Sequence, residues 1–170
     1  MSDARWLEVD DDIRSAVKHL GNAVAIFDRG ISSDDELSSY VGRMAFLQAM
    51  QAGYTSLEGA FERILEILGE EKPTTGFDYH AQIIRRIGRA IEGERPAILA
   101  GELLRAVDEA RRFRHVARKS YDDFEISKAG PAVAAAKRIS TGIEHVIAAF
   151  RKTLAGDGAE ANDKADLGKF

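Results

Sequence analysis

The chain has 170 residues, of which 45% are apolar and 31% are charged. This length suffices for one well-filled hydrophobic core and favours a single domain. The absence of cysteine excludes a disulfide framework, thiolate catalysis and cysteine-based zinc or iron–sulfur sites. The net charge of −4 argues against nucleic-acid binding by the whole surface, although it is compatible with a local basic patch.

The N-terminal sequence and the hydropathy pattern argue against export and membrane insertion. Residues Met1 to Trp6 lack the basic region and following apolar run of a secretory signal. No stretch of about 18 apolar residues occurs, which a membrane-spanning helix would need. We therefore expect a cytoplasmic protein that does not span a membrane.

Apolar residues at spacings of three and four recur almost throughout the chain and predict an all-α fold. A first helix is predicted from about Trp6 to Asp28. Ser33 and Glu36 have the spacing of a capping box, so a second, long helix should begin near Asp34 and end at Gly69. A shorter third helix is predicted from its apolar positions, which are Ile83, Ile84, Ile87 and Ile91.

Two further helices are predicted in the second half of the chain. One runs from about Ile98 to Tyr121, and the other begins at Pro131 and keeps an apolar stripe as far as Leu154. Residues 155–170 are small, polar and aperiodic, so we expect a mobile tail that is dispensable for folding. Residues 1–154 are thus predicted to form a single domain, an up-and-down bundle of four to five helices.

The predicted fourth helix carries a concentration of positive charge. Residues 105–119 include six Arg or Lys residues and two Asp or Glu residues, a local balance of +4. Four of its residues form a continuous band over about 100° of the helix circumference, namely Arg111, Arg114, His115 and Arg118. Such a band can hold a phosphodiester, because guanidinium groups make bidentate contacts with phosphate and histidine transfers protons near neutral pH. Arginine-rich helix faces are also commonly solvated or paired with neighbouring acids, so the band alone establishes no function.

The order of residues in this helix resembles a known signature. The segment from Arg111 to Tyr121 reads RRFRHVARKSY and resembles the signature of the HEPN superfamily, in particular its branch of HepT-like ribonuclease toxins. Three preceding segments occur in the order expected of that branch: YTSLEGAFERIL from Tyr54, HAQIIRRI from His80 and ERPAIL from Glu94. The resemblance extends from about Val41 to Phe150.

The resemblance implies a helical bundle that forms a homodimer, in which two copies of the motif face a shared cleft. It implies RNA cleavage without a metal ion or other cofactor. In that reaction the RNA 2′-hydroxyl attacks the adjacent phosphate, a histidine assists proton transfer, and an arginine stabilises charge on the phosphoryl oxygens. It also implies a partner, commonly a small nucleotidyltransferase antitoxin that transfers AMP to the motif tyrosine and blocks the cleft.

The family motif consists of Arg, four to six residues and His, often followed by one residue and Tyr. Arg114 matches the motif arginine and Tyr121 the modifiable tyrosine, while Arg111 and Arg118 would hold the RNA backbone. The position where the histidine is expected is occupied by Lys119. An unperturbed lysine is protonated near neutral pH, so it can contact phosphate but cannot act as a general base.

Two interpretations of this substitution stay open. Either His115, one helical turn before Lys119, supplies the proton-transfer group while Lys119 assists electrostatically, or the cleft is retained and cleavage is lost. Arg114 and Lys119 also lie about 140° apart on a regular helix. A joint site would therefore require local unwinding near Ser120 or a second subunit.

Two other groups of residues have candidate chemistry. Glu58, Glu62, Glu66 and Glu70 recur at every fourth position of the second helix. A carboxylate-bridged metal site would need partners such as Glu-x-x-His, which the sequence lacks, so this ladder is predicted to be a solvated acidic face or to meet arginines of a neighbouring part of the chain. His80 can line the cleft, but we interpret it as a capping or packing histidine.

Three hypotheses of function follow. The first is a HEPN-type toxin that acts as a homodimeric endoribonuclease, with Arg114, His115 and Lys119 as catalytic candidates. The second is a catalytically silent HEPN module that binds RNA or a nucleotidyltransferase partner in a regulatory role. The third is a purely structural helical adaptor.

Overall fold

The computed structural model of the chain describes residues 4–31, 34–73, 76, 78–119, 122 and 124–166, with side chains as far as residue 156. In these ranges the chain forms five α-helices, one short 3₁₀ helix and no strand. The α-helices are α1 (Arg5–Arg29), α2 (Glu36–Ile67), α3 (Tyr79–Ile87), α4 (Gly101–Lys119) and α5 (Gly130–Asp166). The 3₁₀ helix spans Ile126–Lys128, between α4 and α5. The predicted all-α fold class is confirmed.

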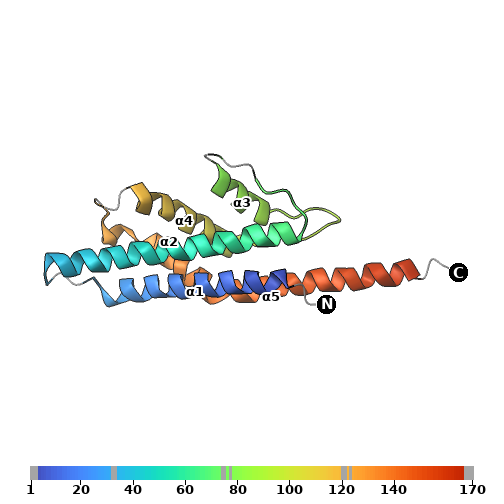
Figure 1. Cartoon of the computed structure of the whole chain (residues 1–170), viewed down its shortest axis with the longest axis horizontal. Helices are drawn as coiled ribbons and strands as arrows, with labels where there is room; N and C mark the ends of the chain where they lie inside the picture. The colour runs from blue at the N-terminus through green and yellow to red at the C-terminus, as the bar shows by residue number, and fades with distance from the viewer. Residues whose placement is uncertain are drawn as a thin grey trace.

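The helices form an elongated bundle (Figure 1). α1 and α2 run antiparallel as a long hairpin, and α5 packs along α1. α4 packs against both α2 and α5, and the short α3 lies against α2 and α4. None of the helices in the described ranges combines the length and apolar composition that a bilayer crossing requires. The predicted helical bundle is therefore confirmed, and its α3–α4 side positions the residues considered below.

The orientation of α4 is fixed by an aromatic cluster in the core. The ring of Phe46 on α2 lies 5.8 Å from that of Phe113 on α4 and 6.2 Å from that of Phe124, which follows α4. All three side chains are buried. Because Phe113 is fixed toward α2 and α5, its neighbour Arg114 emerges 100° further round the helix, at the boundary with α3.

Each end of α2 has a capping motif, of which the sequence predicted only part. The N-cap is Asp35, whose Oδ1 accepts a hydrogen bond of 2.8 Å from the Ser38 backbone N–H. The Ser38 hydroxyl also donates to Asp35 Oδ2, and this hydrogen bond, together with that of the backbone N–H, lowers the pKa of Asp35 below its ordinary value. The predicted cap, Ser33, lies outside the described residues. At the other end Gly69 adopts a left-handed conformation with φ of 73°, and the Glu70 N–H donates to the Leu65 carbonyl, as in a Schellman motif.

Two predicted helix boundaries in the middle of the chain are wrong. α3 ends at Ile87 and does not reach Ile91, because the Ile91 N–H bonds to the Arg95 carbonyl across a tight turn. α4 begins at Gly101, later than predicted, because the backbone N–H groups of Ile98 and Leu99 both donate to the Ile87 carbonyl. The connection between α3 and α4 is therefore a hydrogen-bonded turn.

α5 continues as a helix as far as Asp166, beyond the predicted stripe, and its C-terminal part extends past the bundle in Figure 1. Leu154 is the last of its described side chains that packs against the core. We expect removal of residues 157–170 to change the free energy of unfolding by less than about 0.5 kcal/mol, measured by urea denaturation. The expectation that residues 155–170 form a mobile tail that is dispensable for folding stays a prediction.

Arg151→Ala is the matched control for this truncation. The Arg151 guanidinium bonds to Asp10 at 2.8 Å and lies 4.4 Å from the centre of the Trp6 ring, which ties α5 to α1. Removing the Arg151 side chain should lower the free energy of unfolding by about 1 kcal/mol. A truncation that costs more than Arg151→Ala would show that the tail contributes to the fold.

Candidate active site at the junction of α2, α3 and α4

The four glutamates of α2, Glu58, Glu62, Glu66 and Glu70, form a seam of polar contacts between α2 and residues 72–95, which include α3. Glu58 is only 8% exposed, and Glu62 and Glu70 are partly buried, so the predicted solvated face is wrong for these three residues. Each carboxylate has a partner from residues 72–95: His80 for Glu58, Tyr79 for Glu62, Lys72 for Glu66 and Arg95 for Glu70. The alternative prediction, a meeting with arginine, holds for Glu70 alone.

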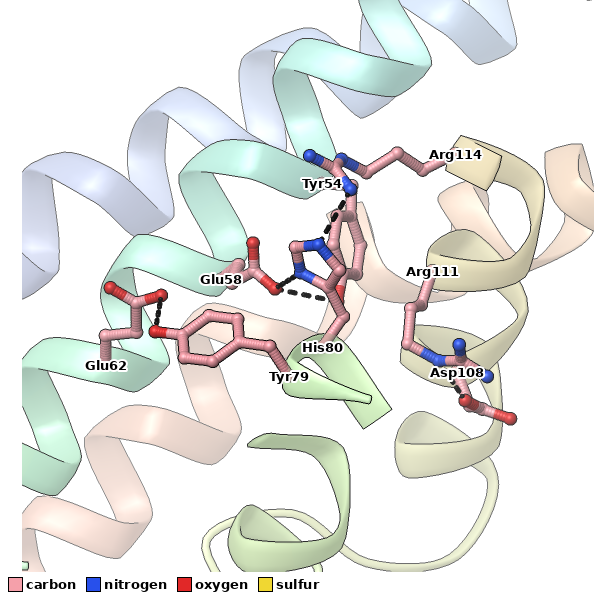
Figure 2. Close-up of polar contacts among 8 residues, drawn as sticks. All are labelled: Tyr54, Glu58, Glu62, Tyr79, His80, Asp108, Arg111 and Arg114. Carbon is pink, nitrogen blue, oxygen red and sulfur yellow. Dashed lines mark hydrogen bonds and ion pairs between the residues drawn. The ribbon is translucent and has the colours of Figure 1, made fainter. Parts of the chain in front are cut away.

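At the centre of this seam Glu58, His80 and Arg114 form a continuous hydrogen-bonded chain (Figure 2). The imidazole Nδ1 of His80 contacts Glu58 Oε1, and Arg114 Nη1 lies 3.1 Å from His80 Nε2. A guanidinium group has only donors, so His80 Nε2 must accept. The proton of the neutral imidazole is therefore on Nδ1, from which it is donated to Glu58. The partners of the ring thus determine its tautomer.

Tyr54 lies on the core side of this chain of contacts and is 1% exposed. Its hydroxyl donates to Glu58 Oε1 at 3.4 Å, and its ring centre lies 5.9 Å from the Arg114 guanidinium carbon. Burial raises the pKa of Tyr54 far above its ordinary value, and the charge of Glu58 raises it further. Tyr54 is therefore a neutral hydrogen-bond donor that supports Glu58.

Tyr79 holds the first turn of α3 in place. Its hydroxyl donates to Glu62 Oε1 at 2.6 Å. The pKa of Tyr79 is raised by burial and by this hydrogen bond, so the phenol stays protonated and keeps donating. Because Tyr79 precedes His80, this contact positions the imidazole as well.

The exposed side of His80 opens into a depression of about 310 Å³. It is lined by Asp78, His80, Ala81, Arg111, Arg112, Arg114 and His115. Arg111 and Arg112 both pair with Asp108, at 2.7 and 2.9 Å, so part of their charge is neutralised. Arg114 has no carboxylate partner among the described residues, and its buried Nε has no hydrogen-bond acceptor there. The charge of Arg114 is therefore not neutralised by a described carboxylate, and an anion bound in the depression can pair with it.

The structure brings together three of the residues that the sequence singled out. Arg111, Arg114 and His115 line this depression, whereas Arg118 lines a different one beside Met44 and Gln48 of α2. Lys119 is exposed at the last residue of α4. Neither His115 nor Lys119 makes a hydrogen bond or ion pair with another described residue. Tyr121, the predicted modification site, lies outside the described part of the chain.

Sequence reasoning missed the partners of Arg114. Tyr54 was not singled out, Glu58 was interpreted as a solvated carboxylate, and His80 was interpreted as a capping or packing residue. The capping role is wrong, because α3 has no side-chain N-cap. The pattern within each helix holds no signal for these pairs, because the contacts of Glu58 with His80 and of Glu62 with Tyr79 form only when α3 docks on α2.

A comparison with protein-family models shows to which family the chain belongs. The model described as "HepT-like protein" matches residues 45–154. The chain belongs to the HepT-like protein family. This family is a branch of the HEPN superfamily, and the resemblance noted in the sequence is confirmed at that level. The HepT-like region begins within α2 and includes Glu58, His80 and Arg114, whereas α1 lies outside it. Comparisons with curated proteins and with solved structures found no match.

Proposed function

We propose that the protein is a HEPN-type toxin of a toxin–antitoxin system, a metal-independent endoribonuclease that acts as a homodimer in the cytoplasm. The observation that supports this most directly is the position of Arg114. Inside the HepT-like region, its guanidinium borders a cationic depression and has no carboxylate partner among the described residues. A phosphodiester anion can pair with such a guanidinium.

In the proposed reaction the RNA 2′-hydroxyl attacks the adjacent phosphorus, and negative charge accumulates on the non-bridging oxygens. Arg114 binds these oxygens and stabilises the charge, because a preorganised guanidinium needs little reorganisation as the charge develops. Arg111 and Arg118 hold neighbouring phosphates. On α4, His115 and Lys119 are the proton-transfer candidates that the sequence predicts, and His115 borders the depression.

The proposed partners are a second copy of the chain and a nucleotidyltransferase antitoxin. Transfer of AMP to Tyr121 would add negative charge and bulk two residues beyond the end of α4. Because the RNA-binding band on α4 is cationic, this modification would compete with RNA for the same surface. Light scattering after gel filtration tests the homodimer, and mass spectrometry after incubation with the candidate antitoxin and ATP tests modification of Tyr121.

The alternative is a catalytically silent HEPN module that binds RNA or a nucleotidyltransferase. The observation that favours it is Lys119, which occupies the motif histidine position. Purified protein incubated with RNA in EDTA separates the two. Cleavage that disappears in Arg114→Ala supports the endoribonuclease. Binding without cleavage, together with cleavage created by Lys119→His, supports the silent module.

We expect RNA affinity to depend on salt, because phosphate contacts release condensed counterions. Arg118→Ala should reduce the slope of log affinity against log salt by about 0.7 on single-stranded RNA, with similar weakening across sequences. Fluorescence anisotropy at several salt concentrations measures this slope. Lys137→Ala removes the same charge from an exposed position on α5 and should leave the slope unchanged. Equal effects of the two variants would contradict a specific role for Arg118.

A further inference from the structure

We infer that His80, positioned by Glu58, is the proton-transfer group that replaces the missing motif histidine. This inference rests on the proposed ribonuclease function and assigns a residue of α3 to it. The observation behind it is the direct contact between His80 Nε2 and Arg114 Nη1 at 3.1 Å. The proton acceptor and the phosphate-binding guanidinium therefore lie beside each other in one protomer. Neither unwinding of α4 nor a second subunit is needed to bring them together.

The chemistry of His80 suits this role better than that of the two candidates on α4. The Nδ1 proton of His80 is held by Glu58, so Nε2 carries the lone pair, which accepts from Arg114 Nη1 at the border of the depression. A buried carboxylate behind an imidazole fixes its tautomer and stabilises the imidazolium that forms when Nε2 takes a proton. His115 has no such partner among the described residues. Lys119 has no lone pair to offer while it is protonated.

His80 is held by buried residues on its Nδ1 side and is partly exposed on its other side. The Glu58 side chain is 10% exposed, whereas that of His80 is 34% exposed. Tyr54 donates to Glu58 from below, and Tyr79 ties the start of α3 to Glu62. The ring is therefore fixed through Nδ1, while its other edge can be reached by a substrate.

The proposed step is a transesterification within the RNA. When Arg114 binds the phosphate, its hydrogen bond to His80 Nε2 breaks. The free lone pair of Nε2 then accepts the proton of the RNA 2′-hydroxyl. The 2′-oxygen forms a bond to phosphorus, and the bond between phosphorus and the 5′-oxygen breaks. The 5′-oxygen takes a proton from water, and the imidazolium returns its proton to solvent. The products are a 2′,3′-cyclic phosphate and a 5′-hydroxyl.

Paired histidine variants of full-length protein test this assignment on an RNA oligonucleotide. His80→Ala should lower kcat by about 10²- to 10⁴-fold, the usual contribution of a general base, while RNA affinity changes by less than about twofold. His145→Ala, which removes the same group from an exposed position on α5, should lower kcat by less than about threefold. His115→Ala should lose less activity than His80→Ala. Added imidazole should partly restore cleavage by His80→Ala but not by Arg114→Ala.

The outcomes separate the failure of this assignment from the failure of the proposed function. A wild-type protein that cleaves RNA, with His80→Ala equally active or with the loss confined to His115→Ala, overturns the role of His80 and leaves the ribonuclease intact. A wild-type protein that does not cleave RNA overturns both. Thermal unfolding of each variant shows whether the substitution has disrupted α3.

Nuclear magnetic resonance of the wild-type imidazole nitrogens gives a test that does not depend on a variant's folding. We expect neutral His80 to carry its proton on Nδ1, with Nε2 unprotonated. As a positioning residue, Glu58 should fix this tautomer, so Glu58→Gln should retain it and Glu58→Ala should lose it together with most of kcat. A neutral His80 protonated on Nε2 in the wild type would contradict the assignment.

Discussion

Arg114→Ala is expected to lower the rate of RNA cleavage by about 10²- to 10³-fold, the usual effect of removing one preorganised donor from a charge-stabilising site. The guanidinium borders the depression, contacts His80 and has no carboxylate partner among the described residues, so its charge is available to a phosphate. Arg114→Lys should restore only a small part of the activity, because an ammonium group keeps the charge but loses the planar, bidentate geometry. Single-turnover cleavage of an RNA oligonucleotide measures both effects.

Arg105→Ala is the matched control for this prediction. Arg105 is an exposed arginine on the same helix, about two and a half turns before Arg114, and it does not line the depression. Its replacement should change the cleavage rate by less than about threefold, as expected for a distant, screened charge. If the two alanine variants were equally active, Arg114 would have no special role.

Arg95→Ala is expected to destabilise the fold by about 3–5 kcal/mol, the usual cost of breaking a buried ion pair from one side. Arg95 is 6% exposed, and its Nε bonds to Glu70 on α2. Its Nη atoms donate to three backbone carbonyls, those of Arg86, Arg89 and Pro96. Removing the side chain leaves the partly buried Glu70 carboxylate unpaired and takes one donor from each of these carbonyls, although that of Arg86 still accepts from the Arg89 N–H. Urea denaturation monitored by circular dichroism measures the loss.

The control is Arg138→Ala, because Arg138 forms an exposed ion pair with Glu102. Exposed pairs contribute little, so this variant should lose no more than about 1 kcal/mol. Arg95 closes the turn that follows α3, and its loss should also release the helix that carries His80. An Arg95→Ala variant as stable as Arg138→Ala would contradict the role of this ion pair in docking α3.

The spacing of apolar residues predicted the long helices well, because each long helix buries a continuous stripe. The first helix was predicted from Trp6 to Asp28 and spans Arg5–Arg29. The same rule failed at Ile91, which continues the spacing of Ile87 but belongs to a turn. A short helix depends on tertiary packing for its stability, so it ends where its backbone groups form hydrogen bonds outside the helix. The spacing of apolar residues does not predict that position.

The sequence predicted the part of the candidate site that lies on α4 but not the contacts between helices. Helical periodicity alone places Arg111, Arg114 and His115 on one band of α4, and these three residues do line one depression. The contact between Glu58 and His80 joins residues 22 apart in sequence, and that between His80 and Arg114 joins residues 34 apart. Such contacts depend on how α3 docks on α2, which the pattern within each helix does not determine.

The central claim is that Arg114 and its neighbours hold RNA for attack by its own 2′-hydroxyl. The most direct test is the chemical identity of the product ends formed by the wild-type protein in EDTA, determined by mass spectrometry of a cleaved oligonucleotide. We predict 2′,3′-cyclic phosphate and 5′-hydroxyl ends, with no cut at a position where the ribose is replaced by 2′-deoxyribose. Products with 3′-hydroxyl and 5′-phosphate ends, or an RNA left intact, would contradict the claim.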